Sequence, residues 1–263
     1  HAFCSRMLRE HALSAGLPPD FAVGLDDDEE AALRQRAWHA HLAAVRRDDP
    51  DALDALHDLG VSPTDLGDTF DVLCTYPDLD PYTHAPPSLP DLETPLEAAF
   101  ALLDTWLPRI PSDDKPDGVM KALRKADRMR RYLPLDTPAQ RADVLDVLAG
   151  ALRSESKAKV TLSRWGSRGS DAYAAAKELR DDRFPHLVTH TLRPALRAFK
   201  ACVHERIMAL VCPAVDRYRR LRADEGQLTH HDLLAFARDL LKNDPSVRKQ
   251  VQERHPRLLE IGR

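Results

Sequence analysis

The sequence predicts a mainly α protein, an irregular bundle of many helices with at most a short strand fragment near residues 21–23. Two observations predict this class. The 263 residues include only 10 glycines and 6% aromatic residues, whereas Ala, Leu, Arg and Glu, which favour helices, are abundant. Several of the 20 prolines directly follow a residue that commonly caps a helix, and proline fits the first helical position. These pairs are Asp49-Pro50, Ser62-Pro63, Thr94-Pro95, Thr137-Pro138 and Asp244-Pro245.

The composition is that of a globular protein outside the membrane. Hydrophobic residues make up 43% of the chain, which is enough to close a core. No stretch approaches the roughly 20 apolar residues of a membrane span, and the first residues lack the pattern of a signal peptide. We therefore expect a cytoplasmic location and no membrane partner. The four cysteines form no C-x-x-C pair, which predicts core thiols rather than disulfides or a zinc site.

The first elements follow from local signals. A helix is predicted from the first residues to Gly16, which Pro18 and Pro19 follow, and Phe21-Ala22-Val23 is the strand fragment. The acidic run 26–30 admits a magnesium site, because paired carboxylates hold that ion in some all-α enzymes. Acids also stabilise the first turn of a helix, and a helix over 31–47 makes this the preferred interpretation.

The remaining elements are helices separated by loops. Helices are predicted over 50–59, 63–76, 95–107, 117–132 and 138–152, with a proline-rich loop at 77–90. Residues 185–223 are apolar at helical spacing and are interrupted by Pro194 and Pro213, which predicts one kinked helix or several end to end. His186 and His190 lie one turn apart and are interpreted as core or surface residues rather than metal ligands. Thr229 and Asp232 form a capping-box pattern before the last helices.

The charge is distributed unevenly along the chain. The net charge of −4 combines −15 over residues 1–108, +6 over 109–168 and +5 over 169–263. Cations crowd the helix at 117–132, and the stretch LRSESKAKVTLSRWGSRGS (152–170) surrounds Trp165 with further cations. Such a stretch can lie along a phosphate backbone with the indole stacked on a base. The alternative is a solvated loop whose Trp packs into the core.

No motif of the chain predicts catalysis. It contains no G-x-x-x-x-G-K-[ST] phosphate loop, no G-x-S-x-G and no internal repeat.

Both ends of the chain nevertheless resemble one family. HAFCSRMLREHALSAGLPPDFAV (1–23) resembles the segment after an early DNA-contacting motif of UvrD-type superfamily 1 DNA helicases. VDRYRRLRADEGQLTHHDLLAFARDLL (215–241) is similar to the stretch where a long helix enters a second motif of that family. Asp232 matches the last acid of that motif, while His230 and His231 replace its usual Phe and acid. The long helical segment between the ends is most similar to the AddA and RecB subunits of bacterial helicase–nucleases.

The resemblance implies a domain organisation. Residues 1–25 and 226–263 would be pieces of helicase domain 1A, and 26–225 would be the helical 1B insertion domain. The parent would be a bacterial ATP-dependent DNA helicase, with or without exonuclease activity, in double-strand-break repair and recombination. The ATP and Mg²⁺ motifs would lie outside this chain, so we expect no cofactor and no catalytic residue within it.

The DNA-binding prediction combines the resemblance with the basic segments. The early motif implies His1 and Phe3 as contacts. The basic segments add Lys121, Arg124, Lys125, Arg128, Lys157, Lys159, Arg164 and Arg168 for phosphates, and Trp165 for stacking. The expected partners are single-stranded or forked DNA and a companion helicase–nuclease subunit. The alternative is a helical scaffold that docks a partner subunit without touching DNA.

Overall fold

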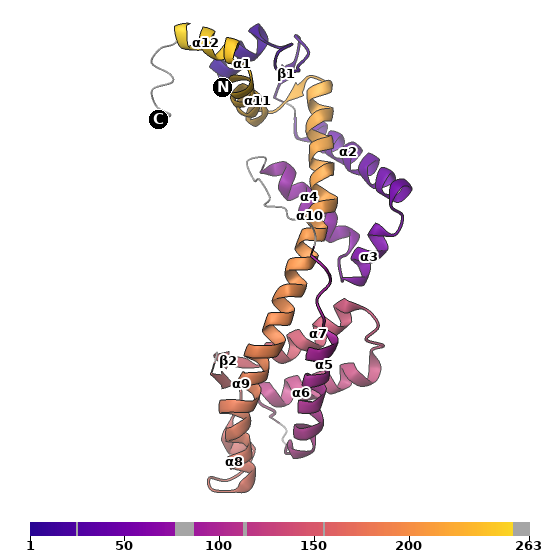
Figure 1. The fold of residues 1–263 in the computed structure, drawn as a ribbon, viewed down its shortest axis with the longest axis vertical. Coiled ribbons are helices and arrows are strands. Elements are labelled where there is room, and N and C mark those ends of the chain that lie inside the picture. The colour runs from indigo at the N-terminus through magenta and orange to yellow at the C-terminus, as the bar shows by residue number, and fades with distance from the viewer. Residues whose placement is uncertain (25, 77–86, 113–114, 155, 255–263) are drawn as a thin grey trace. The chain divides into compact units, whose positions relative to one another are not determined.

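The computed structural model describes residues 1–24, 26–76, 87–112, 115–154 and 156–254, and it confirms a mainly α protein with a few short strands (Figure 1). The chain divides into two compact units. Unit 1 is His1–Pro50, Pro63–Tyr82 and Leu210–Arg263, and unit 2 is Asp51–Ser62 and Thr83–Ala209. The predicted end segments, 1–25 and 226–263, both fall in unit 1, but so do two helices of the predicted middle segment and the C-terminal part of a third.

The first helix and the last two described helices pack together in unit 1. Helix α1 (Ala2–Glu10) contacts α11 (His230–Asn243), and α12 (Pro245–Arg254) follows α11. Strand β1 (Ala22–Val23) pairs in parallel with β4 (Gln227–Leu228), with Ala22 opposite Gln227. One apolar cluster joins these elements, comprising Met7, Leu8, Ala12, Leu17, Phe21, Leu228, Leu233, Ala237, Leu240, Val247 and Val251.

The rest of unit 1 is built from α2 (Asp27–Asp48), α4 (Pro63–Thr75) and the C-terminal part of α10 (Arg193–Asp224). The Trp38 and Phe70 rings stack at a centroid distance of 4.9 Å, and Tyr218 meets Phe70 edge-on at 6.3 Å. Arg222 donates to Asp232 over 2.9 Å, and both side chains are buried. Separating α10 from α11 would leave one of these buried charges without its partner, which is strongly unfavourable. The ion pair therefore holds the two helices together.

Unit 2 is formed mainly by the central part of the chain. Its α-helices are α3 (Ala52–Asp58), α5 (Glu93–Trp106), α6 (Gly118–Tyr132), α7 (Pro138–Ala149), α8 (Asp171–Glu178), α9 (Phe184–Leu187) and the start of α10. The 3₁₀ turns η1 (Leu107–Arg109) and η2 (Leu162–Arg164) and the hairpin of β2 (Leu152–Ser154) and β3 (Lys157–Ala158) complete it. Helix α7 packs on both α5 and α6. The expectation of strand only near 21–23 is therefore wrong, because β2, β3 and β4 also form.

Three of the five predicted helix starts are confirmed. Helix α4 begins at Pro63, Thr137 forms a capping box ahead of Pro138, and the Asp244 carboxylate accepts from the Val247 N–H ahead of α12. The other two are displaced. Helix α3 begins at Ala52 rather than at Pro50, and α5 begins at Glu93, with the Asp91 carboxylate accepting from its first N–H groups.

The long helical stretch keeps its continuity through two wider turns. The π turns η3 (Leu179–Arg183) and η4 (Val188–Leu192) each end two residues before a proline, Pro185 and Pro194. In each, the residue before the proline donates its N–H to the carbonyl five residues back. Proline has no N–H and crowds the carbonyl four residues back, so a wider turn relieves both problems. Pro213 lies inside α10 without interrupting it.

The remaining sequence expectations concern the cysteines and the membrane. Cys74 and Cys202 are buried thiols, as predicted, whereas the thiols of Cys4 and Cys212 are half-buried. Burial raises the pKa of Cys74 to about 12, so this thiol is held in its neutral form. Within the described ranges, no helix combines the length and apolar character that crossing a membrane requires.

Candidate nucleic-acid interface

A single carboxylate, that of Asp117, organises the basic part of unit 2. Its Oδ1 accepts from the Met120 N–H at 2.9 Å and so caps the start of α6. Its Oδ2 accepts from the Trp165 indole Nε1 at 2.8 Å and from the Thr161 N–H at 2.9 Å. Asp117 is buried, and these three donors satisfy it. The start of α6 and the segment that follows the hairpin are therefore held together.

The β2–β3 hairpin lies directly against the first turn of α6. The Val119 N–H donates to the Lys159 carbonyl at 3.2 Å, and the Lys159 N–H donates to the Ala151 carbonyl at 2.8 Å. A Cβ added to Gly118 would come within 2.5 Å of the Lys159 Cβ. Only glycine leaves room for this approach, so the two basic segments meet at the first turn of α6.

Helix α6 has an apolar face and a cationic face. Val119, Met120, Ala122, Leu123 and Ala126 are buried. Lys121, Lys125 and Arg128 are exposed, and their spacing of four and three residues places them on one face. Within the described part of the chain, none of these three cations forms a salt bridge with a carboxylate. The predicted cations Lys121, Lys125 and Arg128, which form no such pair, are here called the cation row.

Most of the other predicted cations of the two basic segments are engaged in hydrogen bonds within unit 2. Arg124 is half-buried, and its guanidinium donates to the Pro111 carbonyl at 3.1 Å. Lys159 donates through Nζ to the Gly150 carbonyl at 2.7 Å, and Arg164 donates to the Lys115 carbonyl. Lys157 is exposed but lies near Asp181, whose pKa is lowered mainly by the Arg180 hydrogen bond and less by Lys157.

Arg168 is exposed, whereas Trp165 is not available for stacking on a base. Trp165 is 4% exposed. Its indole meets the Trp106 ring edge-on at a centroid distance of 6.4 Å and donates its N–H to Asp117. The alternative that the sequence left open, a Trp that packs into the core, describes this residue. The prediction of Trp165 as a stacking residue fails because its N–H is hydrogen-bonded and its side chain is buried inside unit 2.

His1 and Phe3 belong to unit 1, at the start of α1. His1 is exposed, and its ring lies 5.0 Å from that of His230. Phe3 is half-buried against the cluster of the chain ends. It also lines a pocket of about 830 Å³ between α1 and α12, together with Arg6, Glu10 and Arg254 among others. Two of these side chains, Glu10 and Arg254, pair across the pocket at 2.9 Å.

The acidic run begins helix α2, as its preferred interpretation describes, and His186 and His190 are both exposed. Asp26 caps α2 by accepting from the Glu29 N–H at 2.7 Å, and Glu30 accepts from Arg34 at 2.7 Å. His186 and His190 face each other with ring centroids 4.7 Å apart. In the portion of the chain that the structure covers, no three His, Cys, Asp or Glu side chains gather as a metal site would require.

The residue that sequence reasoning missed is Asp117. Its position before a helix marks it as a cap, but nothing in the sequence links it to Thr161 and Trp165, which lie 44 and 48 residues later. Comparisons of the chain with models of protein families, with curated proteins and with solved structures find no match.

Proposed function

We propose that unit 2 binds the phosphate backbone of a polynucleotide through the exposed cations of α6, as the helical arm of a UvrD-type DNA helicase of the AddA/RecB kind. The single observation that carries the proposal is the cation row of Lys121, Lys125 and Arg128, which are exposed and form no salt bridge in the described part of the chain. A row of exposed cations that no carboxylate pairs with attracts a polyanion. Phosphate contacts fix position without reading bases, so the binding has little sequence preference.

The packing of the chain ends supports the helicase part of the proposal. Strands β1 and β4 are parallel neighbours, although about 200 residues separate them in the chain. A helical insertion that leaves a domain after one strand and returns beside it produces this pairing. The chain's own role is to hold the backbone, and in the proposal ATP and Mg²⁺ belong to other parts of the parent enzyme.

A charge-reversal variant tests the backbone contact. We expect the protein to bind labelled single-stranded and forked oligonucleotides weakly at low salt, measured by fluorescence anisotropy. Replacing Lys121, Lys125 and Arg128 with Glu should abolish most of this binding. If three phosphate contacts are lost, the slope of log affinity against log salt should fall by about 2 for a single strand.

A matched variant controls for overall charge. Lys242, Arg248 and Lys249 are exposed cations of α11 and α12 in unit 1. Replacing these three with Glu changes the net charge by the same amount and should leave most of the affinity and the salt slope intact. Equal losses in both variants, or no loss in the α6 variant, would contradict the proposal.

One observation favours the alternative, a scaffold that docks a partner subunit. Asp27, Asp28 and Glu29 are exposed at the start of α2, in the part of the chain with a net charge of −15. A basic surface of a companion subunit would fit these acids. Capture of that subunit together with the absence of oligonucleotide binding would support this function instead.

A further inference from the structure

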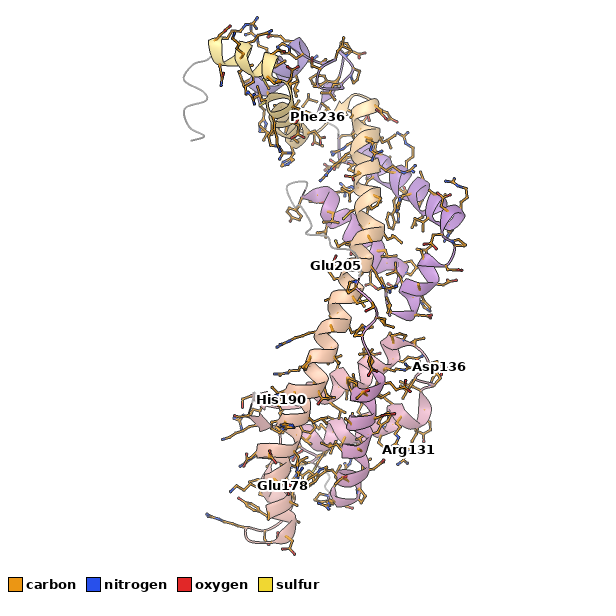
Figure 2. The ribbon with its side chains drawn as sticks, in the orientation of Figure 1. Arg131, Asp136, Glu178, His190, Glu205 and Phe236 are labelled. Atoms are coloured by element: carbon orange, nitrogen blue, oxygen red, sulfur yellow. The ribbon has the colours of Figure 1, made fainter. Side chains whose placement is uncertain are left out.

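An exposed aromatic ring ends helix α6. Tyr132 is the last residue of α6, and 79% of its surface is exposed. Tyrosine ordinarily buries most of its ring, since the ring is a large apolar body. Figure 2 labels Arg131 and Asp136, which lie on either side of it along the chain and locate this end of the helix.

Tyr132 lies on the same face of α6 as the cation row. The four positions 121, 125, 128 and 132 are spaced by four, three and four residues, which keeps them on one face of a helix. At a rise of about 1.5 Å per residue they extend over roughly 16 Å. A cationic row thus ends in a solvent-facing ring.

The neighbouring arginines of the same helix contrast with this row. Arg130 pairs with Asp104 at 2.7 Å and lies over the Phe100 ring, and Arg131 pairs with Asp127 at 2.8 Å. Their guanidinium groups are occupied within unit 2. The ring of Tyr132 and the three row cations are exposed on α6 and have no salt bridge of this kind.

We propose that Lys121, Lys125, Arg128 and Tyr132 form a binding site for single-stranded nucleic acid, in which the cations contact phosphates and Tyr132 stacks on an unpaired base. This inference rests on the backbone contact proposed above and specifies its ligand. A duplex offers phosphates to the row, but neighbouring base pairs cover the faces of its bases. A single strand offers both phosphates and base faces, and single-strand binding proteins combine these two contacts.

The test compares two strands that differ in their bases alone. The probes are a labelled oligothymidylate and an abasic strand with the same number of phosphates. We expect Tyr132→Ala to weaken binding of the oligothymidylate by between about 5-fold and 100-fold and to leave the abasic strand unchanged. Tyr132→Phe keeps the ring and should bind the oligothymidylate like the wild type. Tyr76→Ala, which removes another exposed tyrosine (59% exposed), should also bind like the wild type.

The outcomes separate this inference from the proposed function. If the α6 charge-reversal variant loses both probes while Tyr132→Ala loses neither, the backbone contact stands and the stacking site is refuted. If Tyr132→Ala weakens both probes equally, the ring has a structural role and the stacking site is again refuted. If the charge-reversal variant binds both probes like the wild type, the backbone contact and the stacking site both fail.

Discussion

The indole N–H of Trp165 donates to the carboxylate of Asp117 at 2.8 Å, and both residues are buried. The same carboxylate caps α6 and accepts from the Thr161 N–H. One side chain therefore fixes both the start of the cationic helix and the segment after the basic hairpin. The arrangement of the surface cations depends on a contact that no surface residue makes.

Removing this carboxylate should destabilise unit 2. Asp117→Ala loses a helix cap, typically about 1 kcal/mol, and leaves the Trp165 indole N–H without its acceptor, which costs about 1–3 kcal/mol. We expect a fall of about 3 kcal/mol in the free energy of unfolding, measured by urea denaturation. Asp117→Asn keeps one acceptor oxygen and should lose less.

An exposed acid provides the control for this change. Asp171 lies in the first turn of α8 and is exposed. Asp171→Ala should change the free energy of unfolding by about 1 kcal/mol or less, since it removes only a favourable interaction with the helix dipole. A value for Asp117→Ala that equals the control value would show that the network contributes nothing to stability.

The sequence predicted what depends on neighbouring residues. Thr137 and Thr229 each begin a helix with a capping box, because the donor and the acceptor lie within three residues of each other. The acids at 26–30 stabilise the first turn of α2 for the same reason. The cationic face of α6 also follows from local periodicity, since its buried residues recur at helical spacing.

What the sequence could not predict depends on contacts between distant segments. The pairing of β1 with β4 joins residues far apart in the chain, and each strand alone is two residues long. Trp165 lies in a polar, glycine-containing stretch that is typical of a surface loop, yet Asp117 and Trp106 draw it into the core. The start expected at Pro95 lies at Glu93 instead, because the Asp91 carboxylate accepts from the first N–H groups of α5. Helix α3 begins at Ala52 without a side-chain cap, and nothing in the structure explains its displacement from Pro50.

Stability should decrease in mild acid because of His41. This residue of α2 is buried, and its Nε2 donates to the Leu210 carbonyl at 2.8 Å. Burial lowers the pKa of His41 below its usual 6.5, and the nearby Arg217 lowers the pKa further, against the opposing effect of the carbonyl. The unfolded chain then binds the proton more tightly than the folded chain does. The contribution of His41 to stability is therefore complete above about pH 6.5 and decreases as the pH falls below it.

A pair of glutamine variants in the same helix measures this effect. His41→Gln removes the titrating group and should reduce the dependence of the unfolding free energy on pH between about 7.5 and 5.5. His39 is exposed in the same helix, and His39→Gln should leave that dependence unchanged. An unchanged pH dependence in His41→Gln would assign the acid sensitivity to other groups.

Two glycine-to-alanine changes should have opposite effects, because one glycine is in contact and the other is not. At Gly118 the new methyl group would lie 2.5 Å from the Lys159 Cβ and 3.3 Å from the Lys159 carbonyl oxygen, so the hairpin must move off α6. Overpacking of this kind costs about 1–3 kcal/mol, which is more than the gain of up to about 1 kcal/mol in helix propensity. At Gly67, inside α4, nothing lies within 4 Å, and alanine should stabilise the helix by about 0.5–1 kcal/mol.

The same pair links the hairpin to binding. Lys157 lies in the hairpin and Lys159 directly follows it, while Lys121 lies three residues after Gly118, so moving the hairpin separates the two groups of cations. We expect Gly118→Ala to lower both the free energy of unfolding and the affinity for a single-stranded oligonucleotide at low salt, and Gly67→Ala to leave the affinity unchanged. If Gly118→Ala lowers stability but binds the oligonucleotide like the wild type, the α6 row binds without the hairpin, and the hairpin cations take no part in the interface.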